Sequence, residues 1–140
     1  MTQEDKKLLL TDLSARLSYG VKCTTTNPAA EFGVISGISI KGKISVGTKD
    51  ADIVFECTEV KPYLRPMSSM TEEERKEYEC FIIHREHVNA WGQEWDIDCF
   101  SFDGAPRLIN WLNAHHFDYR GLIPKGLAIE VTEDNNPYKS

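Results

Sequence analysis

GVISGISIKGKISVG, the sequence of residues 33–47, is a set of short β-branched runs separated by glycines. Comparable runs occur at residues 21–24 and 53–57. Isoleucine and valine favour strands, whereas glycine favours the turns and breaks between them. This spacing predicts an antiparallel meander or a small half-barrel. Its tightest hairpin turn is expected at Lys41-Gly42-Lys43.

Three helices are predicted around these strands. Thr2 can cap the first helix, and Thr71 with Glu74 forms a capping box that begins the second. The third helix begins near Pro106, a residue suited to an opening turn, and is expected to continue until Gly121. The residues at helical spacing that mark the core-facing stripes are Leu9, Leu10, Leu13 and Leu17 in the first helix, and Ala105, Leu108, Ile109, Leu112 and His116 in the third.

Separate blocks of strands and helices favour an α+β fold over an alternating α/β fold. The prediction is a single domain in which an antiparallel sheet or half-barrel is packed by about three helices. Residues 1–131 would form this domain, and residues 127–131 would be its closing strand. The polar C-terminal tail, residues 132–140, is expected to fray.

The composition excludes several classes of protein. The chain has 140 residues, of which 16 are Lys or Arg and 22 are Asp or Glu, so its formal net charge is −6. This balance argues against a general nucleic-acid binder, which needs a basic face. No apolar run approaches the ~20 residues of a membrane helix. The first five residues, MTQED, are too polar for a secretory signal.

The cysteines do not form a metal-binding or redox motif of their own. No C-x-x-C pair occurs, which argues against a zinc ribbon or a thioredoxin-type site. Nothing in the sequence indicates export, so four reduced thiols are expected instead of disulfides. The four residues are Cys23, Cys57, Cys80 and Cys99.

The segment KPYLRP, residues 61–66, is the first candidate binding site. Its two prolines predict an ordered loop that ends just before a helix N-terminus, where anions are favoured. Lys61 and Arg65 would bind a small anion, with Arg65 as the bidentate contact, and Tyr63 would offer a stacking face. The alternative is a structural loop that folds Tyr63 and Leu64 onto the core.

A second candidate is a metal site on the helix that follows. Cys80, His84 and His87 would share the face opposite the core, because helix residues are separated by ~100°. A thiolate and two imidazoles at these spacings can bind one zinc ion, with Asp96 or Asp98 as a fourth ligand. The alternative is a solvated helix face that binds no metal.

His115, His116 and Asp118 suggest a general base and its orienting carboxylate. Adjacent residues of a regular helix point ~100° apart, however, so that both histidines cannot serve one site. Imidazolium groups are also favoured at helix C-termini. A structural role at the end of the third helix is therefore the preferred interpretation.

Two longer stretches carry a resemblance: VKPYLRPMSSMTEEE at residues 60–74 and NWLNAHHFDYRGLI at residues 110–123. Together with residues 10–17 and 19–22, they resemble a family of small uncharacterised proteins that is abundant in phages and prophages of gut anaerobic bacteria. The resemblance implies a phage accessory protein that acts in the host cytoplasm. The family has no established activity, so the resemblance assigns no catalytic residue.

The functional prediction is a non-enzymatic phage accessory protein. It would bind a small anionic host metabolite, such as a nucleotide signal used in counter-defence, or a host protein. No membrane partner or cofactor is expected, and a homo-oligomer is compatible with the sequence. The alternative is a small metal-dependent hydrolase that uses zinc bound to Cys80, His84 and His87.

Overall fold

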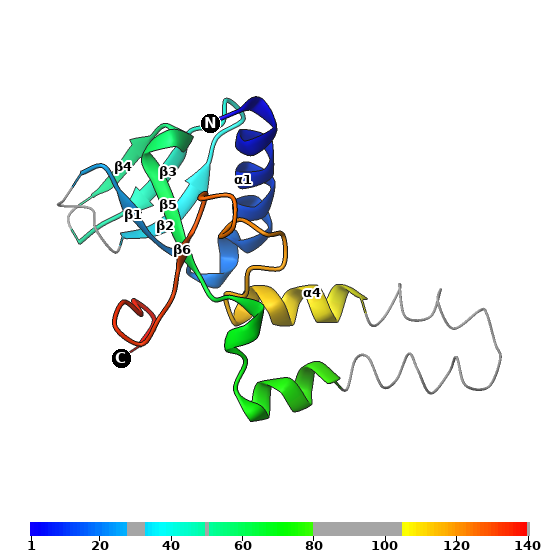
Figure 1. Ribbon diagram of the computed structural model, residues 1–140. Helices are drawn as coiled ribbons and strands as arrows, with labels where there is room; N and C mark the ends of the chain where they lie inside the picture. Colours follow the sequence, from blue (N-terminus) through cyan, green and yellow to red (C-terminus); the bar gives the residue numbers. More distant parts are fainter. Residues whose placement is uncertain (28–32, 50, 80–104, 140) are drawn as a thin grey trace.

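The computed structural model describes residues 1–27, 33–49, 51–79 and 105–139, and these form an α+β domain (Figure 1). A six-stranded sheet has the order β4-β3-β2-β1-β5-β6. Neighbouring strands are antiparallel except β5 and β6, which are parallel. The strands are β1 (Lys22–Thr25), β2 (Gly33–Ile38), β3 (Ile44–Gly47), β4 (Asp52–Phe55), β5 (Val60–Leu64) and β6 (Ile129–Glu130).

The described part of the chain has three α-helices, as predicted, and α1 packs against the sheet. They are α1 (Gln3–Arg16), a helix over residues 72–79, and α4 (Ala105–Ala114). Figure 1 shows α1 along the sheet, while α4 and the helix 72–79 extend away from it together. Across the described ranges, no helix has the length and apolar character needed to cross a bilayer.

The core lies between α1 and the sheet. Leu9 and Leu13 are buried there, as predicted, against strand residues such as Ile44 and Val46. Leu17 was expected on the same stripe, but its side chain is exposed, and it lies just after the end of α1, at the start of a 3₁₀ turn.

The predicted Thr2 cap and the predicted Thr71–Glu74 capping box are both confirmed. The Thr2 hydroxyl accepts a hydrogen bond from the Asp5 amide at 3.0 Å, which fixes the start of α1. The Thr71 hydroxyl accepts from the Glu74 amide at 3.1 Å, and the Glu74 carboxylate accepts from the Thr71 amide at 2.9 Å. These contacts satisfy backbone amides that a helix leaves unpaired at its N-terminus.

The predicted loop at residues 61–66 is wrong, because most of it is strand β5. Antiparallel ladders form hydrogen bonds at every second residue pair. The Thr26 amide donates to the Glu59 carbonyl, and the register places Pro62 opposite Cys23, at a pair without ladder bonds. On the other side, β6 pairs with β5 only from Tyr63 onward. The missing amide of Pro62 therefore removes no bond from the sheet.

The third helix ends earlier than predicted, at Ala114 instead of near Gly121. The His116 amide donates to Asn113 and the Phe117 amide donates to Leu112, each at 3.0 Å. These two bonds and a φ of 62° at His116 form a Schellman motif with histidine at the usual glycine position. Leu112 is buried as predicted, but His116 has left the helical face.

The C-terminal tail was expected to fray, and instead it is bound through Tyr138. The Tyr138 hydroxyl accepts a hydrogen bond from the Lys22 amide at 3.0 Å and donates to the Tyr63 carbonyl at 2.7 Å. It thus bridges β1 and β5 where their direct pairing stops, and its burial raises the pKa of this phenol. The Tyr138 ring also stacks on His116, with the ring centroids 3.8 Å apart.

Candidate functional site

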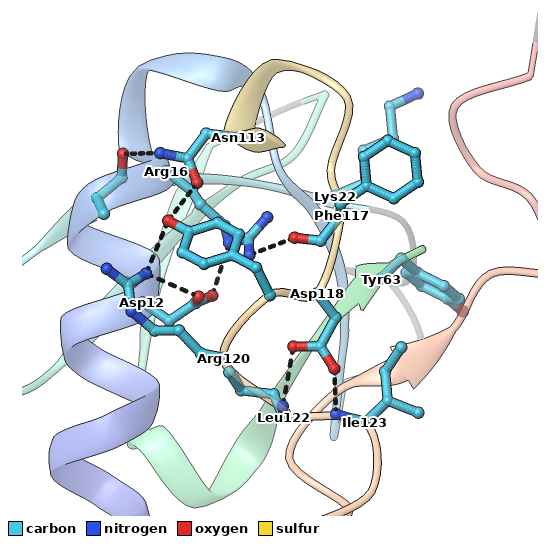
Figure 2. Close-up of polar contacts among 12 residues, drawn as sticks. Asp12, Arg16, Lys22, Tyr63, Asn113, Phe117, Asp118, Arg120, Leu122 and Ile123 are labelled. Carbon is cyan, nitrogen blue, oxygen red and sulfur yellow. Dashed lines mark hydrogen bonds and ion pairs between the residues drawn. The ribbon is translucent and has the colours of Figure 1, made fainter. Parts of the chain in front are cut away.

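A buried charged cluster joins α1 to the segment after α4 (Figure 2). Asp12 and Arg16 lie one turn apart and are fully buried. Arg16 donates from Nε to Asp12 at 2.7 Å and from Nη2 to the Phe117 carbonyl at 2.6 Å. Arg120 donates to the other oxygen of Asp12 at 3.0 Å. The carboxylate of Asp12 therefore pairs with two guanidinium groups.

Neighbouring polar groups extend this cluster along the same segment. The Tyr119 hydroxyl accepts from Arg120 at 3.0 Å and donates to Asn113 at 2.7 Å, and Asn113 donates to the Ala15 carbonyl at 3.3 Å. Asp118 accepts from the amides of residues 122 and 123, both at 2.9 Å. These bonds engage the polar side chains internally, so we assign the cluster a structural role. Asp118 therefore holds the turn at residues 122 and 123, and it does not orient His115 or His116.

The three residues predicted to bind an anion do not converge. Lys61 is exposed on β5, and Tyr63 is buried. The Arg65 guanidinium forms two hydrogen bonds with the Glu74 carboxylate, at 2.8 and 2.6 Å, and lies 4.3 Å above the ring centroid of Phe117. An anion could use Arg65 only by displacing Glu74.

This ion pair makes a testable contribution to stability. The hydrogen bond from Arg65 lowers the pKa of Glu74 from its ordinary 4.5 to about 2. A carboxyl with a lowered pKa stabilises the fold above its unfolded pKa and loses that contribution as the pH falls. Glu74→Gln keeps the capping box but removes the charge, so we expect a loss of about 1–2 kcal/mol at neutral pH.

Denaturant unfolding between about pH 7 and pH 2.5 measures this difference. The gap in unfolding free energy between wild type and Glu74→Gln should narrow as the pH falls through the window below the ordinary carboxyl pKa. Glu73→Gln, at an exposed neighbouring position, is the control and should match wild type. A gap that stays constant down to pH 2.5 would contradict the assignment.

Arg65, His115 and His116 line one cleft, here called the C-terminal cleft, of about 670 Å³. Burial lowers the pKa of His116 to about 4, with help from nearby cations, so this imidazole is neutral at pH 7. Its Nδ1 has no hydrogen-bond partner among the described residues. The other charged residues lining this cleft are Glu133 and Lys139. The charges are therefore mixed and partly neutralised.

A second cleft of about 430 Å³ lies between α1 and the turn that joins β2 to β3. We call it the lysine cleft. This turn contains the predicted Lys41-Gly42-Lys43 hairpin, with Gly42 at a φ of 83°. A Cβ at Gly42 would lie 3.1 Å from Leu10, so glycine also permits the close approach to α1. The cleft is lined by Gln3, Lys6, Lys7, Leu10, Thr11, Lys41, Gly42, Glu56 and Cys57.

The three lysines that line the lysine cleft lack an ion-pair partner in the described chain. Lys6, Lys7 and Lys41 form no ion pair with any carboxylate in the described ranges. Glu56, the acidic residue of the lining, pairs instead with Lys43 at 3.0 Å. The N-terminus of α1 is close by, because Gln3 begins that helix, and its first turn also carries Glu4 and Asp5. This local excess of positive charge occurs in a chain of net charge −6.

Sequence reasoning missed the lysine cleft, although it predicted both elements that form it. The pair Lys6-Lys7 is visible near the start of the first helix, and Lys41 is visible in the hairpin. What the sequence did not reveal is that the hairpin packs against the first two turns of α1. That arrangement depends on tertiary contacts such as Leu10 with Gly42.

The proposed metal ligands Cys80, His84 and His87 lie outside the described residues. Within the described ranges, no group of three His, Cys, Asp or Glu side chains is arranged to hold a metal ion. Cys23 and Cys57 are buried free thiols, and burial raises the pKa of Cys23 to about 12. A thiol with this pKa is protonated at neutral pH and is a poor metal ligand.

A comparison of the chain with protein-family models, curated proteins and solved structures finds no match. The candidate site therefore rests on the geometry and charge described above.

Proposed function

We propose that this chain is a non-enzymatic binding protein and that a small anionic molecule binds in the lysine cleft. The observation that carries the proposal is that Lys6, Lys7 and Lys41 line one cleft and form no ion pair with a carboxylate in the described structure. Ammonium groups that line one cleft repel one another, and an anion bound among them adds attractive contacts that offset this repulsion. Each contact at about 4 Å contributes ~1 kcal/mol in water and more in a partly enclosed site.

The lysine cleft is better suited to an anion than the C-terminal cleft. In the C-terminal cleft Arg65 is neutralised by Glu74, His116 is uncharged at pH 7, and Glu133 opposes Lys139. The lysine cleft, with a volume of about 430 Å³, is lined by three lysines that form no ion pair in the described structure. This volume is within the ~300–1,000 Å³ typical of small-molecule sites.

The biological setting is also a proposal, and it rests on the resemblance of residues 60–74 and 110–123 to phage and prophage proteins. In that setting the chain would be a phage accessory protein in the host cytoplasm, and its ligand would be a host metabolite. Sequestering an anionic metabolite requires binding alone. The long, flexible lysine side chains of the cleft suit binding better than the rigid placement that catalysis needs.

Calorimetric titration with inorganic pyrophosphate at low salt tests the proposal. Lys7→Gln combined with Lys41→Gln should weaken binding by about tenfold or more, because two charge contacts are lost. Both side chains are exposed, so the fold should be unaffected. Raising the salt concentration should weaken wild-type binding and reduce the difference between the two proteins.

Lys139→Gln is the matched control, because it removes one lysine from the C-terminal cleft instead. It should bind pyrophosphate like wild type. Weaker binding by Lys139→Gln, with no effect of the Lys7 and Lys41 substitutions, would place the anion in the C-terminal cleft. That result, or no binding by wild type, would overturn the proposal.

A further inference from the structure

The chemistry of the lysine cleft also indicates the class of its ligand, an inference that rests on the proposed function. We infer that the cleft binds a compact phosphate-rich anion, such as a polyphosphate or a small phosphate ester, and recognises no nucleobase. The nine lining residues include three unpaired lysines but no aromatic side chain.

The number and type of cations favour a ligand with several negative charges. Lys6 and Lys7 come from α1 and Lys41 from the β2–β3 turn, so the cations approach from two sides. A single carboxylate would leave most of this charge unbalanced. A lysine ammonium acts as a mobile point charge without the planar fork of arginine, and it therefore responds to charge more than to ligand shape.

The remaining lining residues add little that could recognise a base. Bases are held mainly by stacking on aromatic or guanidinium planes, worth ~1–3 kcal/mol for each base. In this cleft the uncharged side chains are Leu10, Thr11, Gln3 and the buried thiol of Cys57. Thr11 and Gln3 can donate hydrogen bonds to phosphate oxygens. We therefore expect the nucleoside part of a nucleotide to remain in solvent.

The aromatic groups of the described structure lie elsewhere. His116 and Tyr138 stack at the C-terminal cleft, and Trp111 packs near Phe117 with a centroid distance of 5.7 Å. A ligand that needs both ring stacking and several cations would find these features in two different clefts. This separation supports recognition by charge alone in the lysine cleft.

A ligand series measured by calorimetry without magnesium tests the inference. The affinity should rise from phosphate to pyrophosphate to tripolyphosphate, by several-fold at each step, because each step adds negative charge. Adenosine triphosphate and tripolyphosphate should bind within about threefold of each other, because the adenosine forms no stacking contact. The Lys7→Gln, Lys41→Gln double substitution should lower the affinity for adenosine triphosphate and for tripolyphosphate to the same extent.

The outcomes separate this inference from the proposed function. Binding of adenosine triphosphate at least tenfold tighter than tripolyphosphate, lost in the double variant, would overturn the ligand class but keep the anion site. Equal affinity for phosphate and tripolyphosphate would also overturn the ligand class. The absence of binding by any member of the series would refute both the ligand class and the anion site.

Discussion

Replacing Asp12 with alanine should destabilise the protein by about 3–5 kcal/mol, the loss typical of breaking a buried ion pair on one side. Arg16 is fully buried and would lose its 2.7 Å contact with Asp12. One of its nitrogens, Nη1, already lacks a hydrogen-bond partner in the described structure. Arg120 would lose its 3.0 Å contact with the same carboxylate. The variant would leave two cations without the one carboxylate they share.

Chemical denaturation at neutral pH measures this loss. Ser14→Ala is the control, because Ser14 is an exposed residue of the same helix and its substitution should change stability by at most ~0.5 kcal/mol. A loss below about 1 kcal/mol for Asp12→Ala would show that the cluster does not hold α1 against the segment after α4. Unfolding at room temperature would agree with the prediction, given the limited stability of small domains.

Leu112→Ala should destabilise the protein by about 2–5 kcal/mol, the range for removing a buried leucine side chain. Leu112 is 4% exposed and lies in the last turn of α4. Its carbonyl also accepts the hydrogen bond from the Phe117 amide that ends the helix, so both the backbone and the side chain of Leu112 are held in place. A cavity at this position is therefore difficult to close by local relaxation.

Ile109→Ala is the matched comparison, because Ile109 is on the same helix and is 36% exposed. The loss of stability caused by Ile109→Ala should be smaller than that caused by Leu112→Ala, at about 1 kcal/mol or less. Thermal or urea denaturation of the two variants gives both values. Equal losses, or a larger loss for Ile109→Ala, would mean that α4 presents a different face to the domain.

Local signals in the sequence were sufficient for much of the fold. The glycine-separated β-branched runs predicted the strands β2 to β4, and the hydroxyl residues Thr2 and Thr71 predicted two helix starts. The Lys41-Gly42-Lys43 hairpin was also predicted correctly. In each case the pattern and its consequence lie within a few residues of each other, so no tertiary contact was needed.

The errors arose where a distant partner sets the structure. Pro62 belongs to a strand because the ladder position opposite Cys23 needs no amide bond, and that register is set by β1. His116 ends α4 in a conformation normally taken by glycine, and Tyr138 stacks on it from the tail. The sequence contains both residues but gives no signal that they meet.

The buried ion pair could have been predicted. Leu9, Asp12, Leu13 and Arg16 have the i, i+3, i+4, i+7 spacing of one helical face, so the two charges lie on the leucine stripe. An acid and a base four residues apart on a core-facing stripe indicate a buried pair. The lysine cleft had no comparable signal, because its lysines come from two elements that only the fold brings together.

A titration of isotope-labelled protein with inorganic pyrophosphate, followed by amide resonances in NMR, tests the anion site most directly. The largest shifts are expected at Lys6, Lys7, Lys41 and Gly42, which line the lysine cleft. Amides of His116 and Lys139, at the C-terminal cleft, should change little. If the largest shifts occurred at His116 and Lys139, or if no residue showed a saturable shift, the proposed anion site in the lysine cleft would be contradicted.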